Sequence, residues 1–326
     1  MTDPRYPLTE PFETGVLDTR DGHHVYWERV GDPAGKPAVV LHGGPGSGAA
    51  AWWRRFFDPE RYCVTLFDQR GCGRSRPLAG EPDADLSTIT TQHLIDDIES
   101  LRELHGVDRW LVLGGSWGST LGLAYAVAHP GRVSEMVFWG AVTTTREEVD
   151  WLTWTMGEVY PEAFDALRSL VPHVAPGGNL PAAIHELLMD PAPEVHRPAA
   201  AAWCAWEDRL AALTTTPVPN PRYDDPQFAL GFARLVTRFF GHHGFLPPDG
   251  ISGHLDAIAD IPAVLVRGRL DIAAPLGVVH RLVRRLPLAT LHVVEGEDHS
   301  GAEGMDGLVV AATDRFASGE TPHPPG

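Results

Sequence analysis

The feature that most limits how this chain can fold is a series of short, predominantly apolar runs separated by glycine-rich loops or by segments with helical spacing. These runs lie at residues 38–41, 62–67, 110–113, 133–139, 263–266 and 290–294. Strands without polar alternation are typical of a parallel sheet that helices cover on both faces. Residues 90–104 and 120–128 carry apolar side chains at helical spacing between such runs. The alternation predicts an α/β fold with a mostly parallel, doubly wound sheet.

One long segment of different character interrupts the sheet pattern. Residues 143–251 consist of helical stretches rich in Trp, Ala and Pro, with breaks at 172–178 and 217–226. The strand pattern then resumes, so the chain returns to the sheet that it left. A hairpin of residues 15–19 and 25–30 around Asp21-Gly22 opens the chain. We expect the first part of the core at 1–142, a helical cap at 143–251, the second part of the core at 252–318 and a disordered tail at 319–326.

Composition and charge exclude several classes of partner. Lys and Arg number 26 against 43 Asp and Glu in 326 residues, and the formal net charge of −17 repels nucleic acid and anionic membranes. No stretch approaches the roughly 18 apolar residues of a membrane span, and residues 1–10 lack a basic segment followed by an apolar one. We expect a cytoplasmic protein with no nucleic-acid or membrane partner, and the oligomeric state stays open.

Cysteine and histidine patterns do not indicate a metal site. Cys63, Cys72 and Cys204 form no close pair and cannot all be bridged, which argues against a disulfide framework or a zinc cluster. The pairs His23-His24 and His242-His243 lack both the i, i+4 spacing and the acidic third ligand of known motifs. We therefore expect no metal.

Gly114-Gly115-Ser116-Trp117-Gly118 fits the G-x-S-x-G nucleophile elbow and lies between a predicted strand and a predicted helix, as that motif requires. Glycines two residues either side of the serine leave room for a sharp turn with strained backbone geometry. The turn also sets Ser116 at a helix N-terminus, where backbone amides favour a developing oxyanion. Ser116 is the predicted nucleophile of an α/β-hydrolase fold.

A serine nucleophile needs a base, which in this fold follows late in the chain in the order Ser, acid, His. Asp271 comes shortly after the apolar run 263–266, and His299 follows the last run, 290–294. Both positions lie at the carboxyl ends of strands, the same sheet edge as Ser116. We predict that Asp271 orients the imidazole and that His299 is the general base.

The oxyanion hole of such a site needs two backbone donors. One is the amide of Trp117, the residue after the nucleophile. The second comes from the loop that follows the first strand of the parallel series, here His42-Gly43-Gly44-Pro45-Gly46. We predict Gly44 as this donor, with Gly43 as the fallback.

Several segments together resemble the proline iminopeptidases (prolyl aminopeptidases), and the resemblance runs through nearly the whole chain. The segments that carry it are Tyr26-Trp27-Glu28, HGGPGSG at residues 42–48, DQRGCGRS at 68–75, GGSWGST at 114–120 and HPGRV at 129–133. The resemblance implies an α/β-hydrolase core with a helical cap, no cofactor, and release of N-terminal proline from peptides through an acyl-enzyme.

The resemblance also implies that cap glutamates bind the free imino group of the substrate. Glu207 matches one of them, whereas Val236 stands where the family usually has the second. Glu158 and Asp208 are further candidates for holding the amine. Two smaller departures are Asp298, where the family usually has Gly before the catalytic His, and Ala274, where it usually has Cys.

Two other functions remain open at this point. An esterase, amidase or acyl-transfer enzyme would keep the triad and act on an acylated small molecule, with Val236 lining an apolar acyl pocket. A non-catalytic binding protein on the same scaffold would be free to lose the nucleophile, the base or the oxyanion loop, and this chain keeps all three. Cap aromatics such as Trp206 are candidates for a substrate pocket, although a cap helix must also bury aromatic residues on its core.

Overall fold

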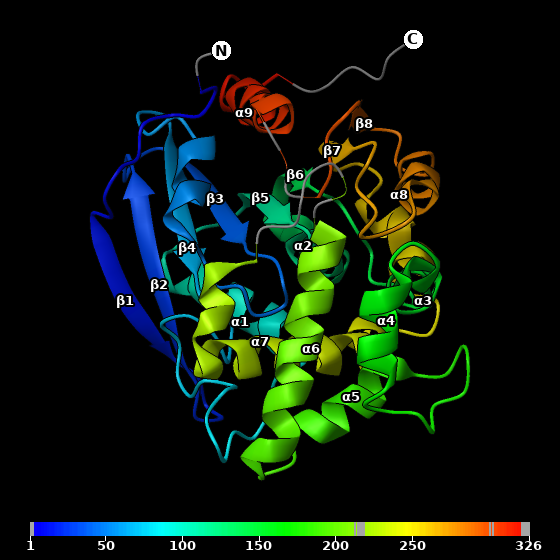
Figure 1. Ribbon diagram of the computed structural model, residues 1–326. Helices are drawn as coiled ribbons and strands as arrows, with labels where there is room; N and C mark the ends of the chain where they lie inside the picture. The colour runs from blue at the N-terminus through cyan, green and yellow to red at the C-terminus, as the bar shows by residue number, and fades with distance from the viewer. Residues whose placement is uncertain (1–2, 212, 214–218, 300, 302, 321–326) are drawn as a thin grey trace.

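The structure, a computed structural model, describes residues 3–211, 213, 219–299, 301 and 303–320. Within these residues eight strands form one sheet in the order β1-β2-β4-β3-β5-β6-β7-β8, which Figure 1 shows running from the blue N-terminal edge to the orange C-terminal edge. The strands are β1 (Glu13–Asp18), β2 (His24–Gly31), β3 (Lys36–Leu41), β4 (Tyr62–Phe67), β5 (Trp110–Gly115), β6 (Val133–Trp139), β7 (Ala263–Gly268) and β8 (Ala289–Val294). Only the β1–β2 and β2–β4 pairs are antiparallel. The predicted fold class is confirmed.

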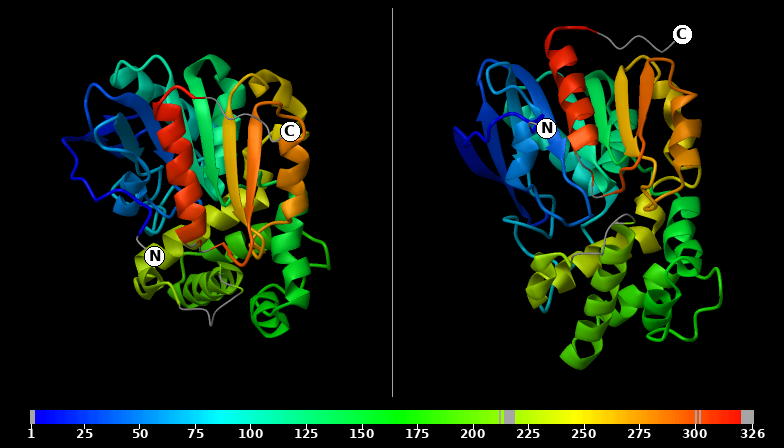
Figure 2. Two further views of the ribbon diagram at one scale, coloured as in Figure 1. Left: turned by 90° about the horizontal axis from the view of Figure 1, so that it is seen from above. Right: turned by 45° about the horizontal axis from the view of Figure 1, so that its top comes forward.

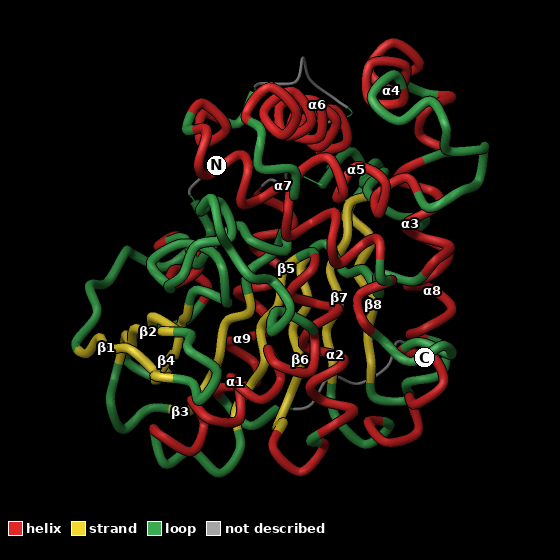
Figure 3. Tube along the Cα trace, turned by 90° about the horizontal axis from the view of Figure 1, so that it is seen from below, coloured by secondary structure: helices red, strands yellow, loops and turns green. Residues whose placement is uncertain are grey.

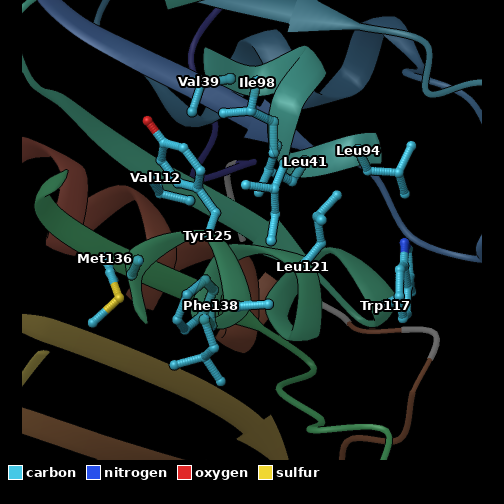
Figure 4. Close-up of a cluster of buried hydrophobic side chains, with 14 of the residues drawn as sticks. Val39, Leu41, Leu94, Ile98, Val112, Trp117, Leu121, Tyr125, Met136 and Phe138 are labelled. Carbon is cyan, nitrogen blue, oxygen red and sulfur yellow. The ribbon is translucent and has the colours of Figure 1, made fainter. Parts of the chain in front are cut away.

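Alternate side chains of the central strands fill two separate cores. One core packs the sheet against α1 (Thr91–Leu104), α2 (Trp117–Ala128) and α8 (Leu276–Val283). Helix α2 is apolar around nearly its whole circumference because it lies between the sheet and α1, so almost every residue in it is buried. Figure 4 shows Leu121 and Tyr125 of this helix among side chains from the strands and from α1.

The opposite face of the sheet is covered by α9 (Glu303–Ala317) and the short 3₁₀ helix at Ala51–Phe56. The red α9 crosses this face in Figure 2, left. Helices on both faces explain why the central strands contain apolar runs without alternation. In the part of the chain that the structure describes, no helix combines the length and hydropathy that crossing a bilayer requires.

Between β6 and β7 the described residues contain five α-helices, which gather beyond one end of the sheet (Figure 2, right; Figure 3). They are α3 (Arg146–Thr153), α4 (Pro161–Arg168), α5 (Leu180–Leu188), α6 (Pro193–Ala211) and α7 (Pro226–Gly241). Most of their buried apolar side chains form a third cluster, whereas Leu235 and Phe239 of α7 belong to the core that contains α1 and α2. The tail predicted at 319–326 lies mostly outside the described residues.

The loops at the carboxyl ends of the parallel strands face these inserted helices. Strand β5 runs to Gly115 and α2 begins at Trp117, so a single residue, Ser116, separates the two elements. The loops after β3, β6, β7 and β8 leave the same edge, because parallel strands end together. This edge therefore brings together segments that are far apart in the sequence.

Candidate active site

Ser116 occupies the turn between β5 and α2 with φ 52° and ψ −122°, a conformation that L-residues rarely adopt. The tight packing around it explains the neighbouring glycines. A Cβ on Gly114 would lie 2.3 Å from the carbonyl oxygen of Gly118, and one on Gly118 would lie 1.9 Å from that of Leu41. The strained serine is held in place because strand and helix meet without room for side chains at these two positions.

The three side chains predicted as a triad lie in hydrogen-bond contact. Nε2 of His299 is 3.0 Å from Oγ of Ser116, and Nδ1 of His299 is 3.0 Å from Oδ2 of Asp271. The side chain of Asp271 is fully buried, whereas that of His299 is 17% exposed. The backbone amide of Ala273 donates to the other carboxylate oxygen of Asp271. The chain of contacts has the geometry of a nucleophile, a base and an orienting acid.

Electrostatics within this chain of contacts favour an ion pair between acid and base. Burial disfavours the imidazolium of His299, but the adjacent carboxylate of Asp271 outweighs this cost, and the pKa of His299 lies above its usual value of 6.5. Burial also disfavours ionised Asp271, yet the charges around it, His299 first, hold its pKa below the usual value. A raised pKa of His299 would stabilise a proton that it took from Ser116.

Both predicted oxyanion donors, Gly44 and Trp117, line the cavity at Ser116. Trp117 is the first residue of α2, so its amide has no carbonyl partner inside the helix. Gly44 has φ 111° and lines the same cavity as Ser116. A Cβ on Gly43 would lie 3.2 Å from Cβ of Ser116. The loop after β3 thus approaches the nucleophile closely enough for a backbone donor, and glycines permit the approach.

One buried side chain that the sequence did not single out ties the two oxyanion segments together. Gln69 donates from Nε2 to the carbonyl oxygen of His42, and its Oε1 accepts from Nε1 of Trp117. The backbone amide of Gln69 also donates to Nε2 of His42, whose Nδ1 contacts the carbonyl oxygen of Gly43. The DQRG segment carried the family resemblance, but only the fold reveals this contact.

A cavity opens over Ser116 between the sheet edge and the inserted helices. Its wall is mostly apolar, and its lining residues are Gly44, Ser116, Trp117, Val142, Thr144, Glu148, Val149, Leu152, Glu207, Leu210, Ala211, Phe240, Ala273, Ala274 and His299. Glu148 accepts hydrogen bonds from Thr143 and Thr145, which gives it a structural partner on its own loop. Glu207 differs from it in this respect.

Glu207, a half-buried residue of α6, lines this cavity with an incompletely satisfied carboxylate. Its Oε1 has no hydrogen-bond partner among the described residues. Burial raises the pKa of Glu207 to about 7, although the nearby His299 acts in the opposite direction. An unpaired buried carboxylate is costly unless a cation joins it. The site therefore has a natural place for a cationic group of a ligand.

Other residues expected at the substrate lie elsewhere. Val236 and Trp206 are almost fully buried in the apolar cluster of the inserted helices and are not among the residues that line the cavity over Ser116. Asp208 lines a different groove, and Glu158 is exposed. Val236 and Phe240 are one turn apart and share a face of α7, so they differ in position along the helix: the apolar cluster covers Val236, whereas Phe240, near the end of α7, also lines the cavity.

Arg238, the residue after Thr237 on α7, lies away from the cavity as well. Its guanidinium donates to the carbonyl oxygen of Ile89 and lies over the ring of Phe245. Arg238 is therefore not placed to repel a substrate cation beside Glu207. Among the described residues, no three His, Cys, Asp or Glu side chains are arranged to hold a metal ion.

Comparison with known proteins agrees with this geometry. The family model described as α/β-hydrolase fold matches residues 36–303. A protein named "probable proline iminopeptidase" from Streptomyces coelicolor is 47% identical, and the match covers 97% of this chain and 98% of that protein. This chain belongs to the proline iminopeptidase family. The resemblance read from the motifs is confirmed.

Proline iminopeptidases of other organisms are also similar to this chain. A proline iminopeptidase of Arabidopsis thaliana is 39% identical, over 95% of this chain and 81% of that protein. The crystal structure of a Mycobacterium smegmatis proline iminopeptidase covers 94% of this chain and 99% of its own with 21% identity and a TM-score of 0.59. At that identity the structural likeness shows the shared fold. Family membership makes the chain a serine hydrolase.

Proposed function

We propose that this protein is an aminopeptidase that releases N-terminal proline, or a similar small residue, from peptides. The observation that carries the proposal is the carboxylate of Glu207, whose buried Oε1 has no hydrogen-bond partner among the described residues, in the same cavity as Ser116 and His299. A free N-terminal imino group is a cation close to the scissile carbonyl. Glu207 would bind this cation and so restrict cleavage to the first residue of a chain, with the inserted helices serving as the cap that closes the site.

The proposed reaction follows the geometry of the triad. His299 Nε2 takes the proton of Ser116 while Oγ attacks the carbonyl carbon of the first residue, and the carbonyl π electrons move to oxygen. The amides of Trp117 and Gly44 bind this oxyanion. The C–N bond then breaks, the imidazolium protonates the leaving amine, and an acyl-enzyme remains. Water, deprotonated by His299, attacks the acyl-enzyme and releases the free amino acid.

A second candidate function is hydrolysis of esters or amides of acylated small molecules. The apolar side of the cavity favours it, because Val142, Leu152 and Phe240 would accept an acyl chain without any polar group. Its substrate would need no cation for Glu207. The two functions share the triad and differ in what occupies the far end of the cavity.

Three substrates compared side by side test the proposal: a proline arylamide, its N-acetyl derivative and a short-chain aryl ester. We expect turnover of the free proline arylamide and loss of at least about a hundred-fold on acetylation, because acetylation removes the cation that pairs with Glu207. Equal turnover of the free and acetylated amides, or turnover of the ester alone, would instead support the second candidate.

Glu207→Gln is expected to lower kcat/KM for the proline arylamide by about a hundred-fold, because a neutral amide replaces a buried, charge-assisted partner of the imino group. Turnover of the aryl ester should change by less than about three-fold, since the ester carries no cation. Asp208→Asn is the matched control: this carboxylate is the next residue on α6 but lines another groove. Similar losses in both variants, or equal losses on both substrates, would contradict the role of Glu207.

The pH dependence follows from burial, which raises the pKa of Glu207 from 4.5 to about 7. The ratio of proline arylamide to ester turnover should fall as the pH falls through about 7, because Glu207 becomes protonated, and Glu207→Gln should abolish this change. Folding stability has the opposite sign: a raised carboxyl pKa means that stability is lost as the pH rises from 4.5 through about 7. Glu207→Gln should therefore melt higher than wild type at pH 8 and not at pH 5. A pH-independent turnover ratio in the wild type would count against this account.

A further inference from the structure

Arg267 is a fully buried guanidinium at the end of β7, and its hydrogen bonds go to backbone carbonyls of two different loops. One Nη donates to the carbonyl oxygen of Ala141 at 2.6 Å, in the loop after β6. The other donates to the carbonyl oxygens of Asp271 and Ala274, in the loop that carries the acid. The side chain thus joins the acid loop to the loop that forms one wall of the cavity.

The charge of Arg267 also lies beside the acid itself. Its Nε is 3.4 Å from Oδ2 of Asp271, the same oxygen that faces Nδ1 of His299. This Nε has no hydrogen-bond partner among the described residues, so the contact with Asp271 is purely an ion pair. The exposed fraction of both side chains is 0%, and water does not screen the pair.

We propose that Arg267 is a positioning residue of the hydrolytic site that fixes the acid loop and shares the Asp271 carboxylate with His299, weakening the stabilisation of the imidazolium. As a consequence, the imidazolium of His299 loses its proton at a lower pH than it would in the same site without this guanidinium. A group with a purely structural role would fix the loop without this second effect. The inference rests on the proposed triad and is independent of the substrate that the cavity selects.

The charges that act on His299 come from several elements. Asp271 and Glu207 raise its pKa, burial lowers it, and Arg267 lowers it as well. The side chain of Asp298 precedes His299 in the same loop and is buried. Of these groups, Arg267 is the cation. Its removal should therefore raise the pKa of His299, whereas removal of either Asp271 or Glu207 should lower it.

The test measures kcat/KM for the aryl ester across pH in wild type, Arg267→Met and Arg267→Lys. The ester avoids the ionisation of a substrate amine. We expect Arg267→Met to move the acid limb of the profile to higher pH and to lower the maximum by about ten- to a hundred-fold, since the loops lose their common donor. Arg267→Lys keeps the charge and should keep the acid limb near that of wild type, with a lowered maximum.

Arg234→Met is the matched control. Arg234 is equally buried, and its guanidinium donates to the backbone carbonyls of Leu188, Ala79 and Glu81, away from the triad. We expect this variant to lower the melting temperature without moving the acid limb. An acid limb that stays in place in Arg267→Met, or that moves equally in Arg267→Met and Arg267→Lys, would overturn the proposal.

If Arg267→Met does not fold, Arg267→Gln takes its place, because the amide retains one donor to a carbonyl and removes the charge. The same prediction applies to its acid limb. Ser116→Ala, assayed in parallel, separates two failures: retained ester turnover in that variant would contradict the triad, whereas lost turnover with an unmoved acid limb in the neutral variants contradicts only the role of Arg267.

Discussion

Ser116→Ala is expected to lower kcat for both the proline arylamide and the aryl ester by about a million-fold, because the variant lacks the nucleophile for which the rest of the site is arranged. Folding should be unaffected. Alanine is no more strained than serine at φ 52°, and among the described residues the hydroxyl contacts only Nε2 of His299. The measurement is single-turnover and steady-state kinetics together with a thermal unfolding curve.

The control for this prediction is Ser100→Ala, a change of the same size on the exposed side of α1. It should leave both activities within about two-fold of wild type, as surface substitutions commonly do. Turnover of either substrate by Ser116→Ala above a thousandth of the wild-type rate would rule out Ser116 as the nucleophile. A large drop in melting temperature would instead mean that the loss reflects unfolding.

Asp271→Asn is expected to lower kcat by about ten-thousand-fold, because an amide at this position favours the wrong tautomer of His299 and no longer stabilises the imidazolium. Unlike Ser116→Ala, it should also destabilise the fold, by about 3 kcal/mol. The reason is Arg267, whose buried charge would lose the carboxylate 3.4 Å away. Asp271 therefore serves catalysis and stability at once, and the two effects are measured by kinetics and by denaturant unfolding.

The matched control is Asp256→Asn, because the side chain of Asp256 is 98% exposed and 3.7 Å from Arg285 at the surface. A surface ion pair of this kind contributes little, so neither activity nor stability should change measurably. Asp271→Asn with full stability would show that Arg267 does not depend on the carboxylate. Asp271→Asn with wild-type kcat would exclude Asp271 as the orienting acid.

Much of the fold was predictable because its signals are local. The strand at 62–67 was predicted with the bounds of β4, and the helix predicted at 90–104 differs from α1 by one residue. The helix predicted at 120–128 in fact begins at Trp117, because the elbow passes from strand to helix without an intervening loop. The bounds of the inserted helices are harder to predict from the sequence, since most of their buried apolar side chains pack on one another and not on the sheet.

The substrate-facing residues show where motif reading stops. The family resemblance predicts position 236 at the substrate, yet Val236 is buried in the cluster of the inserted helices, and Phe240, one turn further along the same face of α7, lines the cavity. Glu207 was expected there too, and it does line the cavity. Both residues lie on helices, and only the packing of one helix against another decides which side of each faces the nucleophile.

The sequence by itself determined the sheet, the elbow and the order of Ser116, Asp271 and His299, because apolar runs, glycine spacing and chain order act over a few residues or along the chain. The tertiary structure alone decided that Gln69 joins the two oxyanion segments and that Arg267 shares the carboxylate of Asp271. These contacts depend on loops that leave neighbouring strands at one edge of the sheet. Their residues are distant in sequence, so no local pattern records them, and burial away from water is what makes their charges and hydrogen bonds matter.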